Sequence, residues 1–180
     1  MSIQSESKRK RKPRPKIDEV ANKLLSGEKS ERFWEFIDFL GENKLRPSGQ
    51  SDHVWSVNYK GIKLFNIGVW ENHWRISDIC HCRKFNFFEK AEKYITDEEL
   101  KQFILDNVSL PSGLRGGNCG MCMGTANVPI FGRIFEAICH CTPIGMRNPE
   151  GKLMEHTKEL ILVSKRVVED VVAEEKQSIN

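Results

Sequence analysis

Apolar side chains recur every three or four residues along several stretches of the chain, and this spacing predicts amphipathic helices. Phe33, Phe36, Ile37 and Leu40 show the pattern along one face. The final helix is expected to be the longest, at about 25 residues or roughly 38 Å. The expected helix starts are Ile17, Ser30, Asn86, the Thr96–Glu99 capping box and Asn148-Pro149, with Gly27 and Gly41 ending the first two helices.

Alternating apolar residues between the second and third of these helices predict three antiparallel strands joined by short turns. Lys60-Gly61 suits a tight hairpin turn between the first two strands. Pro47-Ser48-Gly49 is expected to be a loop. Residues 130–141 resemble a further strand, interrupted or bulged near Gly132. The meander strands are expected at Trp55–Tyr59, from Ile62 onward, and from Trp74 into Cys80 and Cys82.

These elements together favour an α+β fold. We expect an antiparallel β-meander sheet with helices packed on one face, a long C-terminal helix and a zinc-ribbon-like cysteine loop. Residues 17–176 are expected to form a single domain that contains a thiol-bound loop at residues 111–141. No apolar run approaches the roughly 18 residues that a membrane span requires, so we expect no membrane partner.

Charge is distributed unevenly along the chain, whose formal net charge is +3. Residues 1–16 carry a net charge of +6, which leaves −3 for the rest. This tail is polar, basic and broken by Pro13 and Pro15, so it is expected to be disordered. It is also the expected source of any weak, nonspecific nucleic-acid binding, through counterion release. The basic residues of the tail are Lys8, Arg9, Lys10, Arg11, Lys12, Arg14 and Lys16.

All six cysteines occur in three close pairs, which indicates that the thiols converge. Structural zinc takes four tetrahedral ligands, and two pairs from different parts of the chain can supply them. Cys119 and Cys122 lie in a glycine-rich turn, while Cys139 and Cys141 stand two apart on a predicted strand, so both of the latter thiols share one face. The spacing therefore predicts a zinc site at these four cysteines.

Other arrangements of the thiols remain open. Cys80 and Cys82 could replace either pair as metal ligands, although we expect them to pack in the core beside Trp74 and Ile76. An iron–sulfur cluster also takes four thiolates, but the longer cysteine runs typical of ferredoxins are missing. A redox role for Cys119 and Cys122 would need a following helix to lower a thiol pKa, and the next residues do not favour one.

Several motifs resemble an uncharacterised bacterial domain family of clostridial type, across roughly residues 33–165. They are Cys119-Gly-Met-Cys122, the segment Ile130–Phe135, Cys139, Asn148-Pro149-Glu150 and the aromatic region around Tyr59-Lys60-Gly61. In that family a further cysteine often precedes the CxxC motif, where this chain has Gly116 and Gly117. The resemblance thus supports Cys119, Cys122 and Cys139 as a unit, leaves Cys141 as the substitute ligand, and implies no known activity.

The sequence favours a small cytoplasmic, zinc-stabilised domain that binds a small molecule or a partner protein and is not an enzyme. One alternative is a nucleic-acid-associated protein that uses the basic tail, and another is a thiol-redox protein that uses Cys119 and Cys122. The histidines form no recognisable nucleophile-and-base arrangement. The meander carries the aromatic side chains Trp55, Tyr59, Phe65, Trp70 and Trp74, and most of them are expected to lie in the core against the helices.

Overall fold

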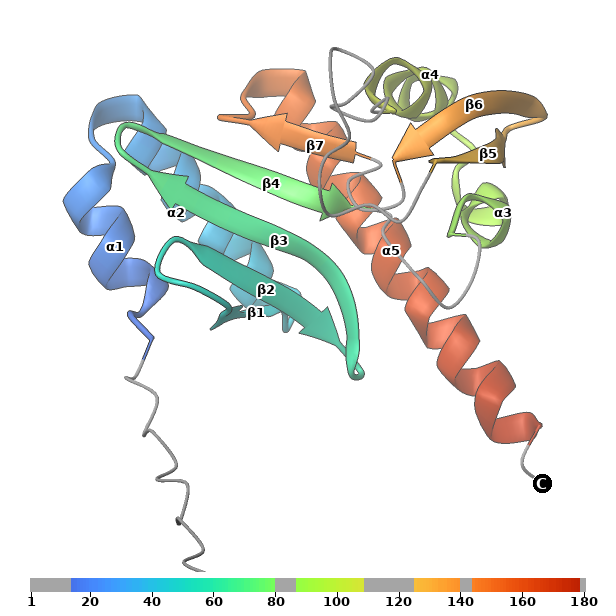
Figure 1. The fold of residues 1–180 in the computed structure, drawn as a ribbon, viewed down its shortest axis with the longest axis horizontal. Coiled ribbons are helices and arrows are strands. Elements are labelled where there is room, and N and C mark those ends of the chain that lie inside the picture. The colour runs from blue at the N-terminus through green and yellow to red at the C-terminus, as the bar shows by residue number, and fades with distance from the viewer. Residues whose placement is uncertain (1–13, 80–86, 109–124, 140–143, 179–180) are drawn as a thin grey trace, which may run out of the picture.

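The central element of the fold is a five-stranded antiparallel sheet with strand order β1-β2-β3-β4-β7. The computed structural model describes residues 14–79, 87–108, 125–139 and 144–178. A separate two-stranded hairpin joins β5 and β6 (Figure 1). The strands are β1 (Arg46–Gly49), β2 (Val54–Tyr59), β3 (Ile62–Trp70), β4 (His73–Ile79), β5 (Thr125–Ile130), β6 (Arg133–Cys139) and β7 (Ile144–Arg147).

The helices bear out the expected α+β class and the long C-terminal helix. Two helices precede the sheet, two shorter ones follow β4, and the last extends for 27 residues. They are α1 (Ile17–Leu24), α2 (Gly27–Glu42), α3 (Phe87–Ala91), which continues as the 3-10 turn η1 (Glu92–Tyr94), α4 (Glu98–Asn107) and α5 (Gly151–Gln177).

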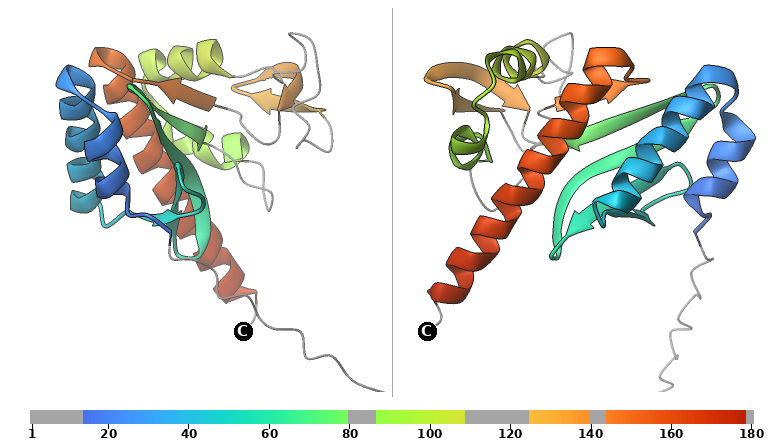
Figure 2. Two further views of the ribbon diagram at one scale, coloured as in Figure 1. Left: turned by 60° about the vertical axis from the view of Figure 1, so that its left-hand side comes forward. Right: turned by 180° about the vertical axis from the view of Figure 1, so that it is seen from behind.

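Helices α2 and α5 lie on the same face of the five-stranded sheet (Figures 1 and 2). Phe36 of α2 packs with ring centroids 6.2 Å from Phe65 of β3 and 5.5 Å from Trp74 of β4. These side chains are fully buried, as are Val57 and Ile76 on the neighbouring positions of the same face. The apolar alternation along β2, β3 and β4 therefore builds the core against these helices.

Two-residue turns of the primed type close the β2–β3 and β5–β6 hairpins. Lys60 and Gly61 have φ values of 47° and 79°, as a primed hairpin turn requires, so this predicted turn is confirmed. Phe131 and Gly132 have φ values of 47° and 73° and do the same between β5 and β6. The strand predicted at residues 130–141 is present in part as β6, and the interruption predicted near Gly132 is a chain reversal and not a bulge.

The sheet has two edge strands that the sequence patterns did not indicate. The predicted loop at Pro47-Ser48-Gly49 is strand β1, which pairs with β2 through Pro47 opposite Val57. Proline is compatible with an edge strand because its missing N–H is not needed there. At the other edge, β7 pairs with β4, and Ile144 and Met146 bury their side chains.

Helix starts also differ from expectation in detail. Helix α2 begins at Gly27 after Ser26, so Ser30 lies inside the helix and does not cap it. At α4 the capping residue is Asp97, whose Oδ1 accepts a hydrogen bond from the Glu99 backbone at 2.7 Å, in place of the predicted Thr96. No helix in the described parts of the chain is long and apolar enough to cross a membrane.

Candidate functional site: the outer sheet face

The face of the sheet opposite α2 and α5 carries no helix within the described residues (Figure 2). The strand registers show which side chains lie on this face, because directly opposite residues in an antiparallel sheet point to the same side. Asn66 stands opposite Ser56 and Ser77, Gly68 opposite Arg75, and Trp70 opposite His73. We call this surface, formed by Ser56, Asn66, Gly68, Trp70, His73, Arg75, Ser77 and Arg147, the outer sheet face.

The indole of Trp70 lies directly over Gly68. A Cβ atom at Gly68 would stand only 2.1 Å from Trp70 Cη2, so a residue with a side chain would force the indole to move. His73 lies nearly parallel to Trp70, with 5.4 Å between ring centroids and 13° between ring planes. The guanidinium carbon of Arg75 is 5.7 Å from the Trp70 ring centroid, within cation–π range.

Two arginines stand side by side on the same face. Arg75 of β4 is directly opposite Arg147 of β7, and both are exposed. Neither forms an ion pair with any residue in the ranges that the structure describes. Like charges directly opposite each other destabilise a sheet, so this position favours an anion that bridges both guanidinium groups.

A polar network forms the neighbouring part of the outer sheet face. Ser56 Oγ donates to Asn66 Oδ1 at 2.8 Å, and Asn66 Nδ2 donates to Asp78 Oδ2 at 2.6 Å. Lys63 Nζ lies 2.9 Å from the same carboxylate oxygen. The network gives the buried Asn66 amide hydrogen-bond partners and fixes the strands beneath the aromatic and cationic cluster.

Sequence reasoning missed this site, because the meander aromatics were assigned to the core. Trp55 and Trp74 confirm that assignment, since both are buried on the helix-covered face. Trp70 is an exception, because it lies on the opposite face and is only half-buried. The available signal was Gly68 two positions before Trp70, since glycine within a strand often marks a close approach of another group.

The described basic residues of the tail meet the edge of the same sheet. Arg14 donates from its guanidinium to the carbonyl oxygen of Gly49 in β1. Trp55 Nε1 donates to the Pro15 carbonyl oxygen at 3.3 Å. Lys16 directly precedes α1. The other predicted tail residues, Lys8, Arg9, Lys10, Arg11 and Lys12, lie outside the described residues.

Most of the predicted metal ligands also lie outside the described residues, namely Cys80, Cys82, Cys119, Cys122 and Cys141. Cys139 is the last residue of β6, and its backbone pairs with Thr125. The expectation that the first cysteine pair continues the face of Trp74 and Ile76 relied on unbroken alternation along β4. That alternation breaks at Asp78, which has a φ of 63° within an irregular register between Ile76 and Ile79.

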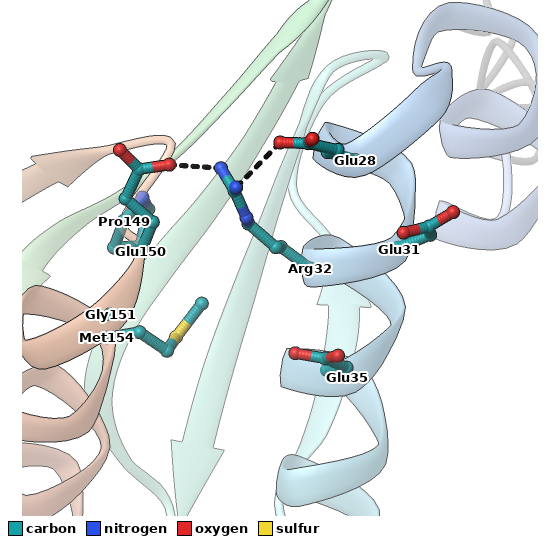
Figure 3. A pocket seen from close by; sticks show the side chains of 8 residues that line it. All are labelled: Glu28, Glu31, Arg32, Glu35, Pro149, Glu150, Gly151 and Met154. Atoms are coloured by element: carbon teal, nitrogen blue, oxygen red, sulfur yellow. Dashed lines mark hydrogen bonds and ion pairs between the residues drawn. The ribbon is translucent and has the colours of Figure 1, made fainter.

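A pocket of about 340 Å³ lies on the other side of the molecule, between α2 and the start of α5 (Figure 3). Arg32 reaches into it and forms ion pairs with Glu28, at 2.8 Å, and with Glu150. Glu31 and Glu35 line the same pocket. The cation is already matched by these carboxylates, so the pocket is best explained as an ionic link between the two helices.

Most of the shifted pKa values belong to side chains of α5 or to groups that contact them. Asp170 accepts hydrogen bonds from Lys93, at 2.5 Å, and from Tyr94 Oη, at 2.6 Å. These two contacts hold the pKa of Asp170 below its ordinary value and raise the pKa of Tyr94 and of Lys93. Tyr59 donates to Glu169 at 2.6 Å, and this bond raises the tyrosine pKa. The groups serve to attach α5 to its neighbours.

Comparison with known proteins gives no relative for this chain. No family model matches it, and no curated protein or solved structure does so either.

Proposed function

We propose that the protein is a non-catalytic binding module in the cytoplasm whose fold is stabilised by structural zinc at Cys119, Cys122, Cys139 and Cys141. Four thiolates would complete a tetrahedral site and leave no open position for a reacting water. The reducing conditions of the cytoplasm keep such thiols available for a metal. The resemblance to the clostridial-type domain family supports Cys119, Cys122 and Cys139 of this set, leaves Cys141 as the substitute for the fourth ligand, and adds no activity.

The observation that carries the zinc proposal is the register of the β5–β6 hairpin. Thr125 pairs with Cys139 at the open end of the hairpin, opposite the Phe131-Gly132 turn. Only three residue steps of chain separate Cys122 from Thr125, and Cys141 follows Cys139 by two. These short connections allow both cysteine pairs to reach the same end of the hairpin, as the proposed zinc-ribbon-like site requires.

The register of the main sheet supports the alternative ligands Cys80 and Cys82 on similar grounds. Ile79 of β4 pairs with Ile144 of β7. In the sequence, Cys80 directly follows Ile79, and Cys141 precedes Ile144 by three residues. The chain between Cys139 and Ile144 also links the hairpin to the sheet. Exchange of either pair for Cys80 and Cys82 would leave the structural role of the metal unchanged.

Metal analysis of protein purified without added zinc tests this proposal. We expect close to one zinc per chain, lost in Cys119→Ser and Cys139→Ser and kept in the control Cys80→Ser. Loss of zinc in Cys80→Ser would instead assign the alternative ligand set. Six freely titrating thiols with no metal would contradict the proposal, and a single fast-reacting thiol of low pKa at Cys119 or Cys122 would support the redox protein in its place.

A further inference from the structure

We propose that the outer sheet face binds a single-stranded nucleic acid, with Arg75 and Arg147 on its phosphates and a base stacked against Trp70 and His73. The inference rests on the proposed function, because it names the ligand class of the binding module. It does not depend on which cysteines hold the metal.

Charge complementarity selects an anionic ligand. Arg75 and Arg147, which stand directly opposite each other, are exposed and form no ion pair with an acidic side chain among the described residues. Arginine binds phosphate oxygens in a bidentate manner, and a bridging phosphate would remove the repulsion between the two side chains. The carboxylates on the opposite side of the molecule, Glu31 and Glu35 among them, would repel the same ligand.

The aromatic pair selects a ligand that also carries flat rings. Trp70 and His73 stack on each other, parallel to within 13°, and Arg75 lies beside the Trp70 ring, so a base that extended this stack would lie next to a cation. Proteins that bind single strands combine these two elements, because unpaired bases expose their π faces while the backbone follows positive charge. The major groove of a duplex admits a helix or a two-stranded ribbon, and a face built across five strands is too wide to enter it, so we assign single strands.

The basic tail joins the sheet at the β1 edge, away from Arg75 on β4 and Arg147 on β7. Arg14 and Pro15 contact β1 and β2, so the chain enters the fold at the edge of this sheet. Lys12 precedes Arg14 by only two residues, and Lys8 to Lys12 is an unbroken run of five basic residues. The binding assigned to Arg75 and Arg147 therefore does not depend on the tail, whose own affinity for phosphates would be nonspecific.

Fluorescence anisotropy with a labelled twelve-nucleotide RNA tests the inference. The measurement uses full-length protein whose zinc content has been determined. The double variant Arg75→Gln/Arg147→Gln should weaken binding and flatten the plot of log K against log salt by about 1.4, since each phosphate contact on a single strand contributes about 0.7. The control is Arg133→Gln/Arg166→Gln, which removes two exposed arginines from β6 and α5 and should leave the slope unchanged. Equal slopes in the two double variants would overturn the proposal.

Two further variants separate the parts of the site. Trp70→Ala should weaken binding by roughly five- to 150-fold, the range for loss of one stacked base, while thermal unfolding verifies that the variant is folded. A full-length protein with Lys8 to Lys12 changed to glutamine should bind more weakly yet keep its dependence on Arg75 and Arg147. Binding that depends on the tail alone would overturn the assignment to the sheet face.

Competition identifies the class of ligand, and metal content separates this inference from the zinc proposal. Poly-glutamate should compete poorly against the RNA, and equal competition would assign the face to acidic proteins and overturn the proposal.

A variant that keeps its zinc and loses RNA binding supports the inference. Protein without any metal that still binds RNA through Arg75 and Arg147 would contradict the zinc proposal alone.

Discussion

At the scale of single residues, Gly68 determines the form of the outer sheet face. Its missing Cβ lets the Trp70 indole pack against the backbone of β3, where the ring lies beside Arg75. In this position the indole also stacks on His73, with 5.4 Å between ring centroids. The smallest side chain in the cluster thus sets the orientation of the largest.

Substitution of Gly68 by alanine should therefore lower stability by about 1–3 kcal/mol through overpacking and shift the Trp70 fluorescence. Gly41→Ala is the matched control, because a Cβ there meets nothing within 4 Å and the residue lies in helix α2. That control should be neutral or more stable by up to about 1 kcal/mol. Chemical unfolding measures both variants, and an unaffected Gly68→Ala would contradict the close contact.

At the scale of elements, α5 connects parts of the chain that are distant in sequence. Its Glu169 binds Tyr59 of β2, its Asp170 binds Tyr94 and Lys93, and its Lys165 donates to the Asn43 carbonyl oxygen after α2 at 3.0 Å. The helix spans 27 residues, about 40 Å at 1.5 Å per residue, so it reaches both the main sheet and α3. Short-range pairs along this one helix hold the layers together.

The lowered pKa of Asp170 predicts an acid-dependent loss of stability. The contribution of this carboxylate should be complete above its unfolded pKa of about 3.9 and should disappear as the pH falls through the lower folded pKa. Asp170→Asn should remove that part of the pH dependence and cost no more than about 1 kcal/mol near neutral pH, because the pair is partly exposed. Urea unfolding between pH 2 and 7 measures the effect.

Glu159→Gln is the control for this comparison, because Glu159 is an exposed carboxylate on the same helix. It should leave the acid limb of the stability curve unchanged. If Asp170→Asn and Glu159→Gln gave the same curves as the wild-type protein, the contacts of Asp170 with Lys93 and Tyr94 would contribute nothing measurable.

The sequence predicted those elements whose periodicity is unambiguous. The meander from β2 to β4 and the long helix α5 each repeat one period over many residues, and both were found. Strands β1 and β7 were missed because four residues give too few repeats to distinguish a strand from a loop. The outer sheet face could not be predicted, because Arg75 and Arg147 are 72 residues apart and only the β4–β7 register brings them together.

At the scale of the whole molecule, the two sheets share a junction. The chain passes from Cys139 of the hairpin to Ile144 of the main sheet within five residue steps, and Ile144 pairs with Ile79 just before Cys80. A metal at this position would join the small sheet to the large one. This link would matter because β5 and β6 pair only with each other among the described strands, and a two-stranded sheet is marginally stable by itself.

Hydrogen exchange with and without a strong chelator tests this arrangement. Removal of zinc should increase exchange in β5 and β6, while β3 and α2 keep the protection of the buried core. An equal increase throughout the protein would indicate that the metal supports the fold globally. No change in any segment would remove the metal from the description of the junction.

The short edge strands have a consequence for behaviour at high concentration. Both edges of the main sheet, β1 and β7, are four residues long, and Pro47 interrupts the backbone donors of β1. A neighbouring molecule that added a strand at either edge would gain few hydrogen bonds, and the nine-residue β3 lies out of its reach between β2 and β4. The fold thereby protects β3, which is the longest of the described strands and is rich in apolar residues that favour β-structure. Fibre formation through β3 would require an edge strand to detach first.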